Sequence, residues 1–183
     1  CVAAGNESQA KHHYYNRFSR DRTPENIDIQ VGQNAGNIWV IITNQFSDII
    51  SVSVRSPTGE LVKRVPARPR FSQVTNLVLE RSEISIFYFF PEGASGDQIT
   101  VVKIRNATPG LWTITAYGDF IIDGEIRAWL PMTGFVSPNV EFLASTPYNT
   151  ITFPATGLGP ICCGAYNSAT FSIPSPPGAR REC

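Results

Sequence analysis

Gly5 and Asn6 end a run of small residues near the start of the chain, Val2-Ala3-Ala4. Such a run fits a strand that stops sharply beneath a loop, because glycine lets the backbone turn where a side chain would clash. The Asn6 amide could then point into a cleft as a hydrogen-bond donor. The same residues also fit an ordinary Asx turn, the commoner interpretation of such a local pattern.

A second candidate segment lies near the other end of the chain. It spans residues 150–156, Thr-Ile-Thr-Phe-Pro-Ala-Thr, and continues into the apolar stretch 161–167. An aromatic residue before proline, followed by a short apolar strand, suggests a cis-proline turn at Phe153-Pro154 that leads into a buried parallel strand.

The remaining residues that could do chemistry form no catalytic or metal-binding pattern. The four cysteines are Cys1, Cys162, Cys163 and Cys183, with no CxxC pair, and their spacing predicts free thiols. His12 and His13 are adjacent, so on a strand their side chains diverge, and no paired acid cluster follows them. We therefore expect no metal and no cofactor, and we find no nucleophile with its base.

Composition restricts the possible partners. The 183 residues carry 15 Lys plus Arg and 15 Asp plus Glu, so the net charge is zero, which argues against a nucleic-acid partner. With 42% hydrophobic residues the chain is too apolar for disorder, and its longest apolar runs are far shorter than the ~20 residues of a membrane span. No signal peptide or initiator methionine opens the chain, so we expect a piece of a longer product.

Alternating apolar and polar residues indicate the elements that position these candidates. Turn residues such as Pro57-Thr58-Gly59 and Asp123-Gly124 separate the alternating segments. The predicted strands are residues 27–31, 38–43, 49–55, 61–65, 73–80, 83–90, 98–104, 111–117 and 124–130. This spacing is typical of an all-β antiparallel sandwich, and a jelly roll is its natural closure.

Individual strands give more specific expectations. Trp112, Ile114 and Ala116 fall on one face of their strand and should be buried. Trp39 and Trp129 should contribute to the same core. After Met132 the alternation loosens to two short predicted strands, 150–153 and 161–166, and the proline-rich residues 174–183 predict an irregular tail.

Together, the two candidate segments resemble parts of the subtilisin-like serine peptidases. Ala3-Ala4-Gly5-Asn6-Glu7 is similar to the oxyanion-hole motif of that family, and residues 150–156 with 161–167 are similar to its Thr-Ile-Thr, Pro-Ala-Thr and Val-Gly-Ala stretch. The large β-rich segment between them resembles the clostridial Csp-type germination proteases, in which a jelly roll interrupts the protease domain. The resemblance implies that Asn6 is the oxyanion-hole donor of an intact parent enzyme.

The departures from the family limit what this chain does alone. The Asp, His and Ser motifs of the catalytic triad are absent, Cys162-Cys163 stands where Thr-Val is usual, and residues 172–183 match no family stretch. We therefore expect a non-catalytic fragment of a serine endopeptidase.

The expected organisation has three parts: a protease flank at 1–22 that carries the oxyanion motif, an inserted jelly roll at 23–145, and a returning flank with an irregular tail at 146–183. The inserted sandwich would be structural or regulatory, and a carbohydrate- or protein-binding jelly roll is the alternative. The expected partners are the rest of the protease domain and the protein substrate of the parent. The resemblance also implies a bacterial extracytoplasmic or spore-associated location.

Overall fold

The computed structural model describes residues 1–19, 23–93, 95–157 and 159–164, and the regular secondary structure of this part of the chain is almost entirely β-strand. A 3-10 turn, η1 (Glu7–Gln9), is its one short helical element among the described residues. The strands are β1 (Val2–Ala3), β2 (His13–Arg17), β3 (Glu25–Val31), β4 (Ile38–Asn44), β5 (Ile49–Arg55), β6 (Leu61–Val65), β7 (Ser72–Leu77), β8 (Ser82–Phe89), β9 (Gln98–Arg105), β10 (Gly110–Phe120), β11 (Glu125–Trp129), β12 (Val140–Phe142) and β13 (Cys162–Cys163).

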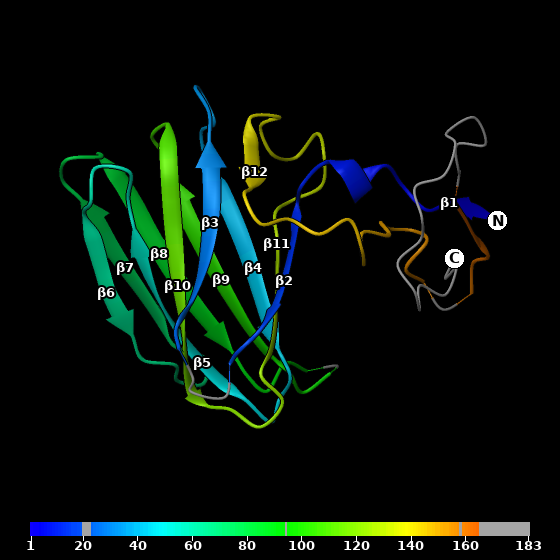
Figure 1. The fold of residues 1–183 in the computed structure, drawn as a ribbon, viewed down its shortest axis with the longest axis horizontal. Helices are drawn as coiled ribbons and strands as arrows, with labels where there is room; N and C mark the ends of the chain where they lie inside the picture. Colours follow the sequence, from blue (N-terminus) through cyan, green and yellow to red (C-terminus); the bar gives the residue numbers. More distant parts are fainter. Residues whose placement is uncertain (20–22, 94, 158, 165–183) are drawn as a thin grey trace.

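Two antiparallel sheets face each other as a sandwich (Figure 1). One sheet has the strand order β12-β3-β10-β5-β6, and the other has the order β2-β11-β4-β9-β8-β7. The chain pairs β3 with β10 in the first sheet and β4 with β9 in the second, the wrapping expected of a jelly-roll-like fold. The all-β sandwich predicted from the sequence is confirmed.

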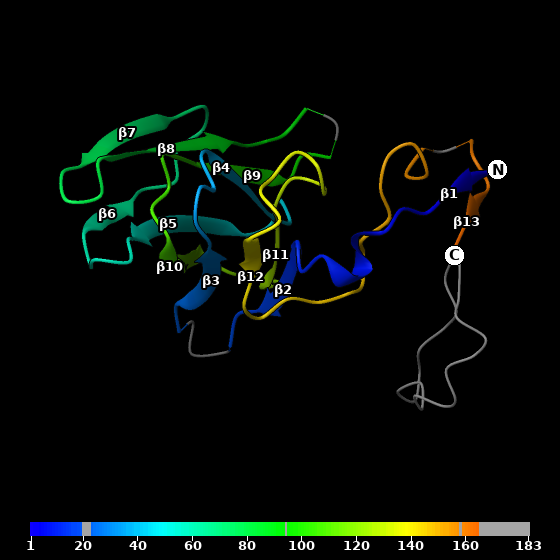
Figure 2. The ribbon, with the colours of Figure 1, turned by 90° about the horizontal axis from the view of Figure 1, so that it is seen from above.

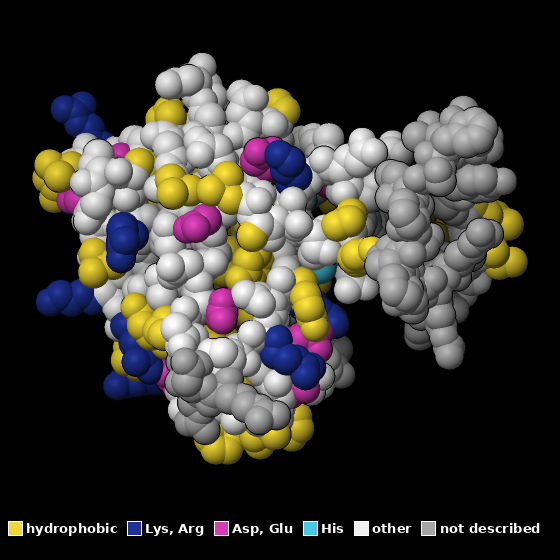
Figure 3. Space-filling model, viewed as in Figure 1, with side chains coloured by type: hydrophobic (Ala, Val, Ile, Leu, Met, Phe, Trp, Pro, Cys, Tyr) yellow, Lys and Arg dark blue, Asp and Glu magenta, His cyan; other side chains and the backbone are white. Residues whose placement is uncertain are grey.

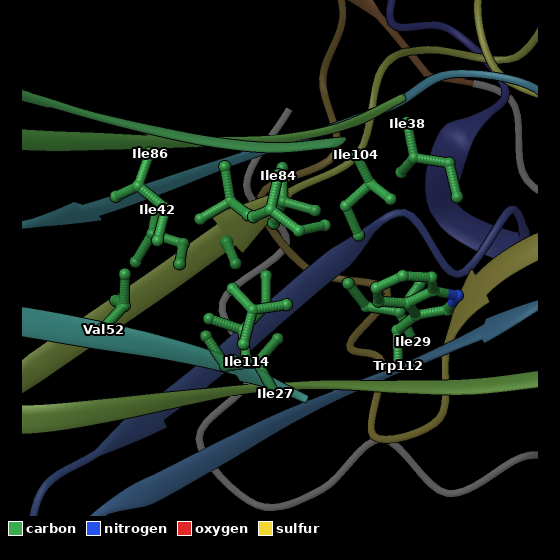
Figure 4. Close-up of a cluster of buried hydrophobic side chains, with 14 of the residues drawn as sticks. Ile27, Ile29, Ile38, Ile42, Val52, Ile84, Ile86, Ile104, Trp112 and Ile114 are labelled. Atoms are coloured by element: carbon green, nitrogen blue, oxygen red, sulfur yellow. The ribbon is translucent and has the colours of Figure 1, made fainter. Parts of the chain in front are cut away.

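The core lies between the sheets and consists mostly of branched aliphatic side chains (Figure 4). In β10, Trp112, Ile114 and Ala116 are fully buried while Thr113 and Thr115 face outward, as the alternation predicts. Burial of each large aliphatic side chain is worth roughly 1.5–3 kcal/mol, so this layer is the main source of stability.

Polar side chains link the two sheets through this apolar layer. Gln98 of β9 accepts a hydrogen bond from Ile50 N (3.0 Å) and donates one to Ile50 O (2.6 Å) in β5. Buried Asp48 accepts bonds from Ile122 N (2.7 Å) and from Gly124 N (2.7 Å) with its two carboxylate oxygens. Because buried polar groups need partners, these contacts fix both the sheet spacing and the loop that enters β11.

All nine predicted strands of the sandwich are present, with small shifts at their ends. The prediction for residues 73–80 was too long, because β7 ends at Leu77 and the chain turns through Arg81, whose φ is 53°. The prediction of a strand at 150–153 was wrong: these residues form no strand. The prediction for 161–166 is reduced to β13, and residues beyond 164 lie outside the described part.

Two strands were missed, β2 and β12. β2 lies within the expected flank 1–22, yet it hydrogen-bonds to β11 from Trp129↔His13 to Glu125↔Arg17 and so forms an edge of the six-stranded sheet. The prediction that Trp39 lies in the core was wrong, because its side chain is on the outer face of β4, 47% exposed, beneath the Lys103 ammonium.

The two ends of the described chain lie beside each other, apart from the sandwich (Figures 1 and 2). On the face of the molecule shown in Figure 3, acidic and basic side chains are interspersed rather than separated into patches. Within the described residues, the structure contains no helix long and apolar enough to cross a membrane.

Candidate functional site

The two candidate segments meet in a parallel strand pair. β1 and β13 pair with the register Val2↔Cys162 and Ala3↔Cys163. Val2 N donates to Ile161 O (2.9 Å) and Ala4 N donates to Cys163 O (3.0 Å). The parallel strand predicted after the proline turn is therefore present, with β1 as its partner, but it is only partly buried in this chain instead of buried as predicted.

Gly5 lies at the end of β1 in a position that only glycine fits. Its φ is +98°, and a Cβ atom built there would lie 2.2 Å from Thr152 Oγ1. Thr152 N also donates to Ala4 O (3.0 Å). The backbone of the Gly-Asn turn is thus held directly against residues 150–156, which continue through the expected cis peptide at Phe153-Pro154.

Asn6 directly follows this contact and is the N-cap residue of η1, immediately before Glu7. Its side chain is exposed and makes no capping hydrogen bond to the turn that it precedes. In an Asx turn, the side-chain oxygen of Asn6 would accept a hydrogen bond from a backbone N–H of η1, and this bond is absent. The Asn6 amide is therefore free to donate to a group outside this turn, which is the property an oxyanion donor needs.

Glu7, the next residue, has both carboxylate oxygens occupied. Oε2 lies 2.8 Å from His12 Nδ1, and Oε1 accepts from Thr133 N at 3.0 Å. Burial by itself raises the pKa of Glu7, but the bonds from His12 and Thr133 outweigh burial, so the pKa lies below its ordinary value. The Glu7 carboxylate is therefore ionised at neutral pH, and His12 Nδ1 must be the donor because an ionised carboxylate only accepts.

His13 points away from His12, as expected for neighbours on a strand. Its ring is 1% exposed and stacks on Trp129, with centroids 5.0 Å apart. Burial lowers the pKa of His13 and the Arg127 charge lowers it further, while the backbone of Tyr148 acts in the opposite direction. His13 is therefore neutral at pH 7, and its packing role differs from the polar role of His12.

A pocket of about 160 Å³ lies where the two chain ends meet the sandwich. Its lining combines Glu7 and residues 149–153 from the chain ends with sandwich residues that include His12, His13, Trp129, Leu130 and Met132. The sequence interpretation anticipated neither this pocket nor the bond between Glu7 and Thr133, which joins residues 126 positions apart. The close spacing of Glu7 and His12 is the only part of this arrangement visible in the sequence.

The described residues offer neither a metal-binding cluster nor a disulfide. They contain no group of three or more His, Cys, Asp or Glu side chains that could hold a metal ion. Cys1, Cys162 and Cys163 are free thiols, as their spacing predicted, and Cys183 lies outside the described residues.

Comparison with known proteins relates the chain to a protein of solved structure. No family model and no curated protein matches the chain. Among solved structures, it is similar to the CspB protease of Clostridium perfringens, with 26% sequence identity and a TM-score of 0.78 over 91% of this chain. The match covers 34% of that protein's chain, so this chain spans about a third of its length. The chain is thus related, in sequence and in fold, to part of a clostridial protease.

Proposed function

We propose that this chain is part of a Csp-type subtilisin-like serine endopeptidase, with Asn6 as a donor of its oxyanion hole. The observation that carries the proposal is the parallel pairing of β1 with β13, which holds the Gly5-Asn6 turn against Thr152. A parallel pair needs a long crossover connection. Here the connection contains the whole sandwich.

The proposed chemistry follows from where charge develops during peptide cleavage. The tetrahedral intermediate concentrates negative charge on the former carbonyl oxygen, and a fixed amide N–H stabilises that charge without reorganising. Asn6 supplies such a donor, exposed and unused by its own turn. The triad residues would come from the rest of the parent, so the chain alone is expected to be inactive.

The sandwich has a structural or regulatory role in this proposal. Its chain enters and leaves at one place, so it can occupy a surface loop of a host domain without disturbing that domain. The rest of the protease domain and a protein substrate are its proposed partners. The proposal also implies that the parent protease has a bacterial extracytoplasmic or spore-associated location.

A test in the full-length protease compares Asn6→Ala with Gln9→Ala, an exposed position in the same turn. Asn6→Ala should lower kcat about 10²–10³-fold, the loss known for removal of one oxyanion-hole donor from a subtilisin. Gln9→Ala should leave kcat unchanged. An unchanged kcat in Asn6→Ala would contradict the proposal, as would inhibitor-sensitive turnover of a peptide ester by the present chain alone.

A carbohydrate-binding role is the second candidate, favoured by a polar pocket of about 470 Å³ at one end of the sandwich. Amide, guanidinium and carboxylate groups line it, the kinds of groups that bond sugar hydroxyls, from Asn37, Asn76, Arg81, Glu83, Arg105 and Asn106. Titration with soluble oligosaccharides, followed by NMR, should shift the Asn76 and Asn106 amides if this role is real. No shift at millimolar sugar would remove this candidate.

A further inference from the structure

The Glu7 carboxylate joins the Gly5-Asn6 turn to the sandwich. It accepts from His12 Nδ1 (2.8 Å) and from Thr133 N (3.0 Å), and its side chain is only 12% exposed. Because hydrogen bonds to an ionised and largely buried carboxylate are among the stronger ones in proteins, these contacts restrain the residue that follows Asn6.

Both donors are anchored in the sandwich. His12 O accepts from Leu130 N (2.9 Å), which continues the pairing of β2 with β11. Thr133 follows β11 in a turn in which Phe135 N donates to Met132 O (2.9 Å). The position of the Glu7 carboxylate is therefore set by the sandwich, not by the two chain ends.

Asn6 is held on both sides but makes no side-chain bond within its turn. On its N-terminal side, Gly5 abuts Thr152. On its C-terminal side, Glu7 is tied to the sandwich, and Ala10 N closes η1 on Glu7 O (3.1 Å). The backbone of Asn6, from which its amide extends, is consequently held in place through its two neighbours.

We propose that Glu7 is a positioning residue through which the sandwich sets the orientation of Asn6. This inference rests on the proposed function, in which Asn6 stabilises the oxyanion. It assigns the sandwich a specific contribution to the reaction: the sandwich supplies the two donors that keep the oxyanion turn in place. A displaced catalytic group lowers the rate of the chemical step, with little effect on substrate binding remote from that group.

The test uses the full-length protease with a peptide substrate. Glu7→Gln should lower kcat roughly 10- to 100-fold with KM nearly unchanged, the range expected for a displacement of up to about 1 Å. Glu141→Gln is the matched control, because it removes the exposed Lys11–Glu141 ion pair (3.0 Å) at the same junction without touching Glu7. Its kcat should equal that of the unmodified enzyme.

A double mutant separates positioning from general destabilisation. If Glu7 acts through Asn6, the Asn6→Ala, Glu7→Gln double mutant should be no slower than Asn6→Ala alone. His12→Gln, which keeps an amide donor, should retain most of kcat, whereas His12→Leu should match Glu7→Gln. Additive losses in the double mutant, or an unchanged kcat in Glu7→Gln, would overturn the inference and leave the role of Asn6 standing. An unchanged kcat in Asn6→Ala would instead remove the proposed function, and this inference with it.

A second measurement needs only the present chain. NMR order parameters of the Asn6 and Glu7 backbone amides should fall from about 0.85 to below about 0.6 in Glu7→Gln, while amides of β8 stay unchanged. Retained order at Asn6 would contradict the inference even where the full-length variant cannot be prepared.

Discussion

The hydroxyl of Tyr88, in β8, donates a hydrogen bond to Val65 O at 2.7 Å, in β6 of the opposite sheet. The Tyr88 hydroxyl oxygen also accepts a hydrogen bond from Val52 N at 3.0 Å, in β5. Val52 lies at the irregularity between β5 and β6, where the register shifts between Val52 and Val54. One side chain from the facing sheet thus bonds the backbone groups at this irregularity.

Tyr88→Phe should therefore destabilise the protein by about 1–3 kcal/mol, because it leaves Val52 N and Val65 O buried without this partner. Chemical denaturation measures the loss. Tyr148→Phe, at a 61% exposed position, is the control and should stay within about ±0.5 kcal/mol. Equal effects of the two substitutions would contradict this role for Tyr88.

The ionisation of Tyr88 gives a related expectation at high pH. Burial raises the pKa of Tyr88 from its ordinary value of 10.0 to about 12, despite opposing effects from the Val52 amide and Arg64. Because the folded state keeps the proton longer, this contribution to stability is complete below pH 10 and is lost as the pH rises toward 12. Between pH 10 and pH 12 the unfolding free energy should thus fall more steeply for the unmodified protein than for Tyr88→Phe. An equal pH dependence in the two proteins would contradict this role for the Tyr88 proton.

Glu80 should contribute to loss of stability in acid. Burial raises its pKa, but hydrogen bonds from Thr108 and Thr58 outweigh burial and hold the pKa below its ordinary value of 4.5. The folded state therefore prefers the ionised form, so its contribution is present above pH 4.5 and is lost as the pH falls through the lower folded-state pKa. The stability difference between the unmodified protein and Glu80→Gln should shrink on acidification, and a constant difference would refute this assignment.

Gly5→Ala should disrupt the β1–β13 pairing. The new Cβ would collide with Thr152 Oγ1, in addition to the strain of φ +98°. Gly59→Ala is the control, because Gly59 has φ +94° but no atom within 4 Å of its Cβ position. Hydrogen exchange at the Ala4 and Thr152 amides should accelerate strongly in Gly5→Ala and stay unchanged in Gly59→Ala. Unchanged exchange in both would mean that the contact with Thr152 is not limiting.

Native-state hydrogen exchange should also separate the chain ends from the sandwich. The amides of the central strands β4, β9 and β10 should exchange only through global unfolding, whereas those of Asn6 and Ile161 should exchange much faster. β2 should follow the sandwich, because it pairs with β11 along its whole length. Equal protection at Ile161 and in β10 would show one cooperative unit and would contradict the proposed insertion.

Local pattern was sufficient for most of the sandwich. Alternation bounded by Pro-Thr-Gly and similar turns placed β5 and β6 at their observed ends, because apolar residues at every second position and the turn residues between them are both local signals. β2 was missed because its order depends on pairing with β11. Trp39 was misassigned because its aromatic side chain was given more weight than its position in the strand. In the alternating pattern of β4, Trp39 lies on the outer face, and its neighbours Ile38 and Val40 lie on the buried face.

In the candidate site, too, local sequence patterns were predictable and long-range contacts were not. Gly5 and Asn6 form a local pattern, so the sequence was enough to single them out. The partners of Glu7 depend on where the turn after β11 lies in space, and no local pattern encodes the approach of Thr133. Contacts between residues far apart in the chain were the part that the sequence left undetermined.

The adjacency of the two chain ends has a consequence for the order of folding. Ala4 and Thr152 are 148 residues apart in sequence. Closing so long a flexible loop costs about 4 kcal/mol of chain entropy, more than two or three exposed backbone hydrogen bonds return. A folded sandwich already holds its entry and exit points together, so the junction between the ends forms after the sandwich as a nearly local event. During synthesis, any domain that uses β1 and β13 must therefore wait for the sandwich between them to fold.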